Sequence, residues 1–173
     1  MRAVFEVTFA AIALAGAWND LRTHRIPNVL TLSGLLLALA LRAWLGFDAV
    51  LDGFWGACIA FLIALPLFAI GGFGGGDAKF LIALGAFLGA SRLFGGLLAI
   101  ALAGGVFAVL HAVRRGVIVP VLLNCGAMLR YWLSFGRSGR RIALDSPGVT
   151  AIPYGVPLAF GSLAWWFFEG RFP

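Results

Sequence analysis

Long apolar segments separated by short polar breaks run through the chain, and this pattern predicts a bundle of membrane-spanning helices. A helix needs about 20 predominantly apolar residues to cross a bilayer, with a range of about 17 to 25. The segments predict six spans. Four of them cover residues 3–18, 29–45, 53–70 and 150–168, and the other two are short helices within residues 78–113 that turn near residues 91–96. We therefore expect an all-α fold, a polytopic membrane helix bundle of about six transmembrane helices.

The apolar segment of residues 117–135 is treated separately because it contains Pro120 and Arg130 and has arginines on both sides. A crossing here would place one of the two arginine clusters outside, against the tendency of Lys and Arg to stay in cytoplasmic loops. We therefore interpret the segment as a re-entrant or interfacial helix. With the amino terminus outside, the expected inner side holds Arg22, Arg25, Lys79, Arg114, Arg115, Arg130, Arg137, Arg140 and Arg141, and the outer side Arg2, Arg42, Arg92 and Arg171.

The composition supports a membrane location and excludes several classes of protein. Of the 173 residues, 62% are apolar and only 12% are charged, whereas a soluble domain averages about half apolar and about a quarter charged. Soluble enzymes, nucleic-acid-binding modules and disordered regulators are therefore excluded as first interpretations, and we expect one integral-membrane domain over residues 1–173. The net charge of +6 is interpreted as membrane topology and not as a nucleic-acid signal.

Two local features have simple structural interpretations. The first apolar segment resembles a cleavable signal peptide with Arg2 before it, but Glu6 interrupts the apolar stretch, so we favour a retained span. Cys58 and Cys125 lie in separate apolar segments and have no metal-binding or disulfide spacing. We expect both cysteines to be buried small hydrophobes.

Most of the seven acidic residues have interpretations that need no active site. Glu6, Asp48, Asp52 and Glu169 are expected at the outer ends of spans. Asp52 is suited to N-cap a helix that begins at the next residue. Asp145 lies in a basic loop and is interpreted as a surface ion partner.

Asp20 and Asp77 differ from the other acids because two complete spans separate them in the chain. Two crossings return the chain to the same side of the membrane, so both carboxyls are expected at the cytoplasmic ends of helices. Taken singly, Asp20 could be a solvated partner of Arg22 or Arg25 beyond the end of its helix, and Asp77 could N-cap a helix that begins at Ala78. Taken together, two carboxyls at one membrane face are what an aspartyl hydrolase requires.

A glycine-rich run over residues 71–76 precedes Asp77. Gly71 and Gly76 have the spacing of a Walker phosphate-binding loop, but Asp77 stands where its lysine should be and no strand is expected before it. We interpret the run as a notch without side chains, through which an extended substrate chain can approach Asp77. Close packing of helices through small residues is the alternative.

The two histidines are interpreted as bystanders, His24 at the membrane interface and His111 as a satisfied packing residue. No Ser or Cys has a nearby base that would activate it. No cluster of His, Asp and Glu has the spacing of metal ligands. We therefore expect neither a metal nor an organic cofactor.

Two motifs carry a resemblance to a known family. Asp20 followed by His24-Arg25-Ile26-Pro27-Asn28, and Gly74-Gly75-Gly76-Asp77 followed by Lys79, resemble the two signatures of type IV prepilin leader peptidases, membrane aspartyl proteases whose second motif reads G-x-G-D. The run Ile152-Pro153-Tyr154-Gly155-Val156-Pro157 also resembles a family feature near the carboxyl end. Because the chain begins with a span and has no cysteine pairs, it is similar to the short form found with tight-adherence (Flp-type) pilus systems, and we expect no N-methyltransferase activity.

The resemblance implies an endopeptidase of the bacterial cytoplasmic (inner) membrane that removes the leader of a prepilin or pseudopilin at the cytoplasmic face. Asp20 and Asp77 would be catalytic and activate water, and supporting or substrate-facing roles are expected for Gly74, Gly76, Lys79, Pro27 and Asn28. Lys79 would either adjust Asp77 electrostatically or anchor the chain at the interface. The expected partners are the apolar helix of the substrate and the lipid bilayer, with the pilus assembly machinery as a further candidate and no nucleic acid.

Two other functions are open from the sequence. A small transporter or proton-relay protein could use the same carboxyls, although transport sites tend to lie near the bilayer midplane and both residues are expected at helix ends. A noncatalytic subunit of a pilus or secretion assembly is the second alternative. It predicts that Asp20→Asn and Asp77→Asn leave pilus assembly intact.

Overall fold

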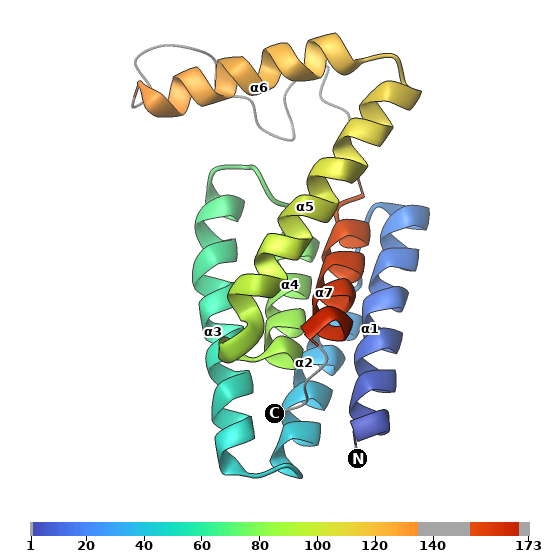
Figure 1. Cartoon of the computed structure of the whole chain (residues 1–173), viewed down its shortest axis with the longest axis vertical. Helices are drawn as coiled ribbons and strands as arrows, with labels where there is room; N and C mark the ends of the chain where they lie inside the picture. The colour runs from blue at the N-terminus through green and yellow to red at the C-terminus, as the bar shows by residue number, and fades with distance from the viewer. Residues whose placement is uncertain (1, 135–152, 170–173) are drawn as a thin grey trace.

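Seven α-helices make up the part of the chain that the computed structural model describes, residues 2–134 and 153–169. In chain order they are α1 (Arg2–Thr23), α2 (Asn28–Ala43), α3 (Phe47–Ala69), α4 (Gly75–Leu88), α5 (Ala90–Arg114), α6 (Ile118–Leu133) and α7 (Gly155–Glu169). Figure 1 shows α1 to α5 and α7 running side by side, with α6 lying across one end of this bundle. The expected all-α bundle is confirmed.

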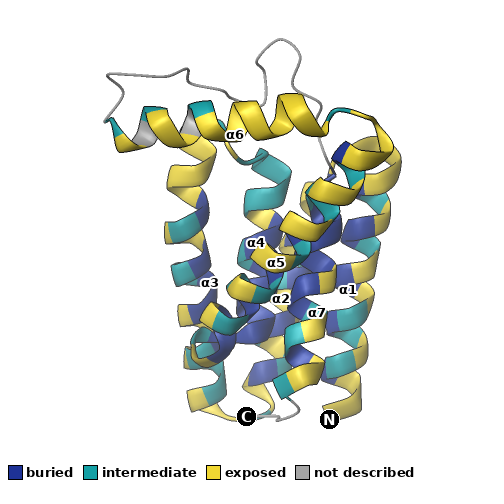
Figure 2. Cartoon of the chain, turned by 45° about the horizontal axis from the view of Figure 1, so that its top comes forward, coloured by how far each residue is buried: buried dark blue, intermediate teal, exposed yellow. Residues whose placement is uncertain are grey.

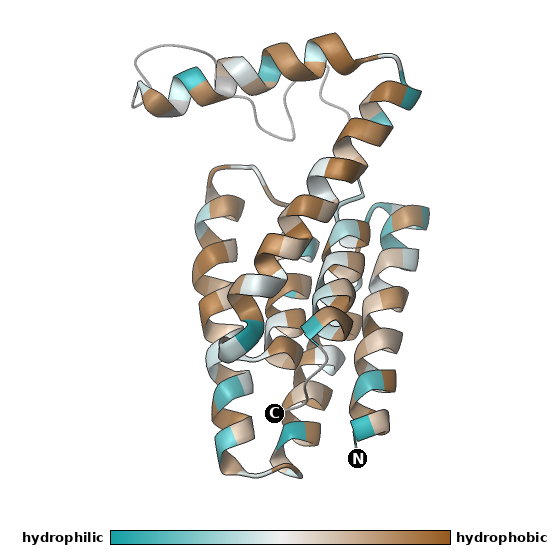
Figure 3. Cartoon of the chain, in the orientation of Figure 1, coloured by the Kyte–Doolittle hydropathy of each residue, from teal (hydrophilic) through white to brown (hydrophobic). Residues whose placement is uncertain are grey.

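The outer surface of the bundle is largely apolar. Three helices, α1, α3 and α5, are long and apolar enough to cross a membrane. Helices α2, α4 and α7 contain 16, 14 and 15 residues, fewer than the about 20 of a full crossing, and they pack among the longer helices. Exposed positions cover the outside of the helices in Figure 2, and many of them are hydrophobic in Figure 3. The chain is therefore a membrane protein.

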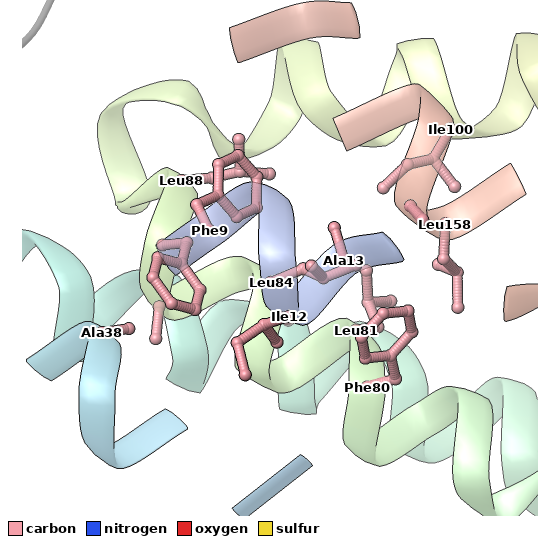
Figure 4. Close-up of a cluster of buried hydrophobic side chains, with 14 of the residues drawn as sticks. Phe9, Ile12, Ala13, Ala38, Phe80, Leu81, Leu84, Leu88, Ile100 and Leu158 are labelled. Carbon is pink, nitrogen blue, oxygen red and sulfur yellow. The ribbon is translucent and has the colours of Figure 1, made fainter. Parts of the chain in front are cut away.

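Helix α4 occupies the centre of the bundle and fixes the position of the glycine run that precedes it. It contacts α1, α2, α3, α5 and α7, and it is buried along almost its whole length after the first turn. Figure 4 shows the buried side chains of α4 among those of its neighbours, including Phe80, Leu81, Leu84 and Leu88 of α4, Phe9, Ile12 and Ala13 of α1, and Leu158 of α7. In lipid, such packing contacts hold helices together, because lipid tails are as apolar as the side chains.

Small residues let α3 and α4 approach backbone to backbone. A Cβ on Gly56 would collide with the main-chain oxygen of Gly85, and a Cβ on Gly85 would lie 2.7 Å from the Cβ of Ala60. This is the small-xxx-small packing of membrane helices. By contrast, a Cβ on Gly76 would lie 3.4 Å or more from its neighbours, which is nearly ordinary contact. Close helix packing therefore belongs to α3 and α4 and not to Gly76.

Two helix boundaries differ from the sequence prediction. The turn between α4 and α5 lies at Gly89 and not near residues 91–96, because Gly89 adopts a φ of +79° that other residues rarely adopt. Helix α3 begins at Phe47, so Asp52 lies inside the helix. The prediction that Asp52 is an N-cap is therefore wrong.

A buried arginine joins α2, α3 and α4 at the end of the bundle opposite the glycine run. Arg42, only 1% exposed, donates hydrogen bonds to the main-chain oxygens of Ala86 and Phe87, each at 2.9 Å. It also donates to the main-chain oxygen of Ala49 and to Oδ2 of Asp52, both at 3.0 Å. Arg42 thus satisfies carbonyl groups at the carboxyl end of α4, which have no partner within their own helix, and Asp52 balances its charge.

Polar contacts also connect α5 to α3 and α7 at this end. The main-chain N–H and the hydroxyl of Ser91 donate to the Asp52 carboxylate at 3.0 and 3.3 Å. The guanidinium of Arg92 lies 3.4 Å from Oε2 of Glu169 and 4.8 Å from the ring centroid of Trp166. These contacts hold the carboxyl end of α7 against the first turn of α5.

Helix α6 lies apart from the bundle. Among the helices of the described residues it contacts only α5, and Figure 1 shows it crossing the end of the bundle. This placement fits a re-entrant or interfacial helix better than a further crossing.

Cys125 on α6 is exposed and Cys58 is only partly buried, so the prediction that both are buried is wrong. Cys125 is exposed because, in the described part of the chain, α5 is the helix that contacts α6.

Candidate active site

Asp20 lies inside α1, near its carboxyl end, because the helix continues to Thr23. The helix ends where the main-chain N–H of His24 donates to the main-chain oxygen of Asp20 at 2.9 Å and His24 adopts a φ of +50°. Pro27, in an extended conformation, precedes the first residue of α2. Asp20 is only 4% exposed. Its interpretation as a solvated residue beyond the end of the helix is therefore wrong.

Asp77 lies in the first turn of α4, which begins at Gly75. The N-cap residue is Gly74, with φ −71° and ψ 148°, and not Asp77. A Cβ on Gly74 would lie 2.8 Å from Oδ2 of Asp77. A side chain at position 74 would therefore displace the carboxyl, which gives a physical reason for glycine there.

The two carboxyls line one pocket with a volume of about 310 Å³. The other lining residues are His24, Arg25, Ile26, Asn28, Gly74, Gly75 and Gly76. The pocket lies at the end of the bundle where α1 and α3 end and α2, α4 and α7 begin, the end that α6 crosses in Figure 1. The structure thus brings Asp20 and Asp77 together, as the count of crossings predicts.

Burial and the proximity of the two carboxyls determine the charge of this pocket. The pKa of Asp77 is raised to about 6, first by burial and then by the negative charge of Asp20, against the opposing effect of a main-chain hydrogen bond from Gly74. Asp77 lies outside the three helices that are long enough to cross a membrane. Two neighbouring carboxyls do not both ionise readily. The pair is therefore suited to hold one proton, as acid and base catalysis requires.

Asp20 is held by a residue 135 positions later in the chain. The main-chain N–H of Gly155, the first residue of α7, donates a hydrogen bond to Oδ2 of Asp20 at 2.7 Å. Tyr154 packs the edge of its ring against Phe73, with ring centroids 5.3 Å apart. Phe73 belongs to the glycine run that leads to Asp77. One short segment, Tyr154 and Gly155, therefore touches both halves of the pocket.

Tyr154 and Gly155 are the neighbours of the site that the sequence did not assign. Two prolines and a glycine within residues 152–157 are an unusual start for an apolar helix, and this is the signal that marks them. Nothing in the sequence pairs them with Asp20. Burial raises the pKa of the Tyr154 phenol, and the negative charge of Asp77 raises it further, so the hydroxyl stays protonated near the pocket. Residues 150–152, expected at the start of the last span, lie outside the described residues.

Lys79 and Asn28 lie at the border between the pocket and a neighbouring groove. Nζ of Lys79 donates to Oδ1 of Asn28 at 2.9 Å, so the ammonium is directed to α2 and not to the Asp77 carboxyl. The groove has a volume of about 360 Å³ and is lined by Asn28, Thr31, Leu32, Leu35, Lys79 and Ile82. Asn28 lines both spaces. The groove between α2 and α4 therefore adjoins the carboxyl pocket at Asn28.

The two histidines lie in different surroundings. His24 is exposed and lines the pocket, which agrees with a position at the membrane interface. Nε2 of His111 is buried, and no described residue gives it the hydrogen bond that a satisfied packing residue would have. Within residues 2–134 and 153–169, no group of three His, Cys, Asp or Glu side chains could hold a metal ion. Asp145, expected to be a surface ion partner, lies outside these residues.

Comparisons with known proteins give one match. The model of the type IV leader peptidase family matches residues 7–109. The matched region contains Asp20, Asp77 and the glycine run, and it ends before α6 and α7 begin. No curated protein and no solved structure matches the chain.

Proposed function

Because the chain belongs to the type IV leader peptidase family, we propose that it is an aspartyl endopeptidase that removes the leader of a prepilin or pseudopilin at the cytoplasmic face of the bacterial inner membrane. The observation that carries the proposal is the single pocket that holds both Asp20 and Asp77. Family membership supports peptidase activity in general. Two carboxyls in one pocket favour the aspartyl type, because such a pair can share a proton.

In the proposed mechanism one carboxyl accepts a proton while the other donates one. Ionised Asp20 takes a proton from water, and the oxygen of that water bonds to the scissile carbonyl carbon while Asp77 protonates the carbonyl oxygen. The tetrahedral intermediate then collapses. The carbonyl re-forms and returns its proton to Asp77, and Asp20 gives its proton to the leaving nitrogen as the carbon–nitrogen bond breaks. The raised pKa of Asp77 supports its role as the protonated member.

The glycine run supports access of an extended chain to this pair. Gly74, Gly75 and Gly76 line the pocket and present main chain only. A substrate segment can therefore approach Asp77 without meeting side chains from this wall. Irregular backbone near the membrane is tolerated where it lines a cavity, which is its position here.

Basic residues support a cytoplasmic position for the pocket. Arg25 lines it, Arg22 lies in the last turn of α1, and α5 ends at Arg114 on the same end of the bundle in Figure 1. Arginine and lysine are enriched in cytoplasmic loops and interact there with anionic lipid headgroups. The leader that is removed would then lie on the cytoplasmic side.

We propose that the groove between α2 and α4 receives the apolar part of the substrate that follows the cut. Asn28 and Lys79 give the groove a polar mouth beside the carboxyl pocket, and Leu32, Leu35 and Ile82 make it apolar further along. A substrate that is polar at the scissile bond and apolar after it matches this order.

Leu32→Trp is expected to raise KM about tenfold with little change in kcat, because the larger ring fills the groove without touching the carboxyls; a tenfold change corresponds to about 1.4 kcal/mol of binding. Leu32 is 58% exposed, so the substitution does not overpack the interior. The matched control is Leu14→Trp. Leu14 is 48% exposed and lines a separate groove between α1 and α7 that shares no residue with the carboxyl pocket. Equal KM values for both variants and wild type would exclude the α2–α4 groove.

The proposed function is tested by cleavage of a prepilin from the same genome with the purified protein in liposomes. Mass spectrometry of the products identifies the cut and the new amino terminus, which we expect to be unmethylated. A specific cut after the leader supports the peptidase. If correctly folded wild type leaves every candidate prepilin and pseudopilin intact, the transporter and noncatalytic assembly functions become the better interpretations.

A further inference from the structure

We propose that Gly155 is a positioning residue of the active site, whose main-chain N–H holds the Asp20 carboxylate in place. The inference rests on the proposed function, because it assigns a role in the same reaction. If Gly155 has this role, the pocket between α1 and α4 has its full set of contacts to Asp20 only when α7 is packed against these helices. Helix α7 lies outside the region that matches the family.

The contact between Gly155 and Asp20 has the features of a strong hydrogen bond. The distance from the Gly155 nitrogen to Oδ2 of Asp20 is 2.7 Å, and both residues are buried. A hydrogen bond to an ionised carboxylate is shorter and about twice as strong as one between neutral groups. Gly155 is also the first residue of α7, where main-chain N–H groups have no partner within the helix and the helix dipole favours a negative charge. The bond fixes one carboxylate oxygen and leaves the other available for water.

The close approach explains why position 155 is a glycine. A Cβ at this position would lie 2.9 Å from both Cβ and Oδ2 of Asp20, and 3.0 Å from Cδ1 of Ile26. Asp20 lies in α1 and Ile26 lines the pocket, so neither can move without changing the site. Any side chain at position 155 would therefore displace the carboxylate or push α7 away from α1.

Helix α7 is held firmly enough to act as a positioning element. It packs against α5 and α1, and a Cβ on Gly161 would collide with the main chain of Ile100. Arg92 and Glu169 connect its far end to α5 at 3.4 Å. At its near end the Tyr154 ring packs on Phe73. The N–H of Gly155 is therefore presented to Asp20 by a packed helix and not by a free loop.

Two substitutions test the added volume by itself and the added volume together with the loss of the donated hydrogen bond. Gly155→Ala keeps the N–H but adds the clashing Cβ. Gly155→Pro adds the same clashing Cβ and also removes the N–H, at the first position of a helix, where proline is tolerated. We expect each to lower kcat about 100-fold, the effect of misplacing a catalytic group by about 1 Å, with KM within about twofold of wild type because the glycine run and the groove are unchanged.

Two control variants keep a structural effect apart from a positioning effect. Gly105→Ala makes the same change where a Cβ would meet nothing within 4 Å, so kcat and thermal stability should match wild type. Glu169→Gln weakens the far end of α7, so it should lower the unfolding temperature and leave kcat unchanged. Each variant is assayed for kcat, KM and thermal unfolding in the same liposomes or detergent.

A fall in kcat for both Gly155 variants, at unfolding temperatures no lower than that of Glu169→Gln, supports the inference. Wild-type kcat in either folded Gly155 variant overturns it. Loss of folding in both also overturns it, because Gly155 would then be a packing residue only. Failure of the proposed function is distinguishable, since wild type itself would then not cleave, or Asp20→Asn would cleave as well as wild type.

Discussion

Asp20→Asn and Asp77→Asn are each expected to lower kcat for prepilin cleavage by about 10³-fold, within the range of general acid and base catalysis. Asparagine has the size of aspartate and keeps a carbonyl oxygen that can accept the Gly155 hydrogen bond, so the fold and the pocket should be retained. It cannot take a proton from water or hold one for the carbonyl oxygen. The measurement is single-turnover cleavage of reconstituted prepilin, with KM expected to change little.

The matched control is Asp48→Asn, because Asp48 is an exposed carboxylate in the first turn of α3, at the opposite end of the bundle. It should cleave at the wild-type rate. The double variant of Asp20 and Asp77 should be no slower than either single variant, because residues that act as one unit are not additive. Cleavage by either single variant at more than about a tenth of the wild-type rate would contradict the aspartyl mechanism, since loss of an acid or base lowers the rate at least about 100-fold.

Arg42→Met is expected to have the largest effect on stability, lowering the free energy of unfolding by about 3 kcal/mol. Methionine replaces the aliphatic part of the Arg42 side chain but donates no hydrogen bond. The carbonyl oxygens of Ala86 and Phe87 would lose the donors that the structure gives them, at about 1–3 kcal/mol for each group left unsatisfied. Asp52 would lose its positive partner. Its side chain is 24% exposed, so water compensates for part of that loss.

The effect is measured by thermal or denaturant-induced unfolding of the protein in detergent. The matched control is Arg2→Met, which removes a contact of 2.9 Å between Arg2 and Glu6 on the exposed start of α1. Surface pairs of this kind contribute about 0–1 kcal/mol, so little change is expected. Folded Arg42→Met should still cleave, because Arg42 lies at the end of the bundle away from the pocket. Equal stability of the two variants would show that Arg42 does not hold α4.

The pattern of apolar segments predicted the class of fold and the side of the bundle on which the site lies. Segment length is a local property, and each crossing reverses the chain, so the number of spans between Asp20 and Asp77 was enough to bring them to one end. Helix ends were predicted less well. Polar residues such as Asp52 and Ser91 look like breaks in a sequence, but both lie inside helices. There Asp52 pairs with the buried Arg42, and Ser91 donates to Asp52.

The details of the candidate site depended on tertiary structure. Of the seven residues that the sequence marked, five line the pocket, namely Asp20, Asp77, Gly74, Gly76 and Asn28. Lys79 lines the neighbouring groove and Pro27 lines neither. It could not show that Gly155 donates to Asp20 from 135 residues away, because the packing of α7 against α1 and α5 decides that contact. The sequence by itself thus determined which residues have suitable chemistry and at which end of the bundle they lie. Only the packing of the helices decided which atoms touch, since hydrogen bonds and close contacts depend on distances that the order of residues does not encode locally.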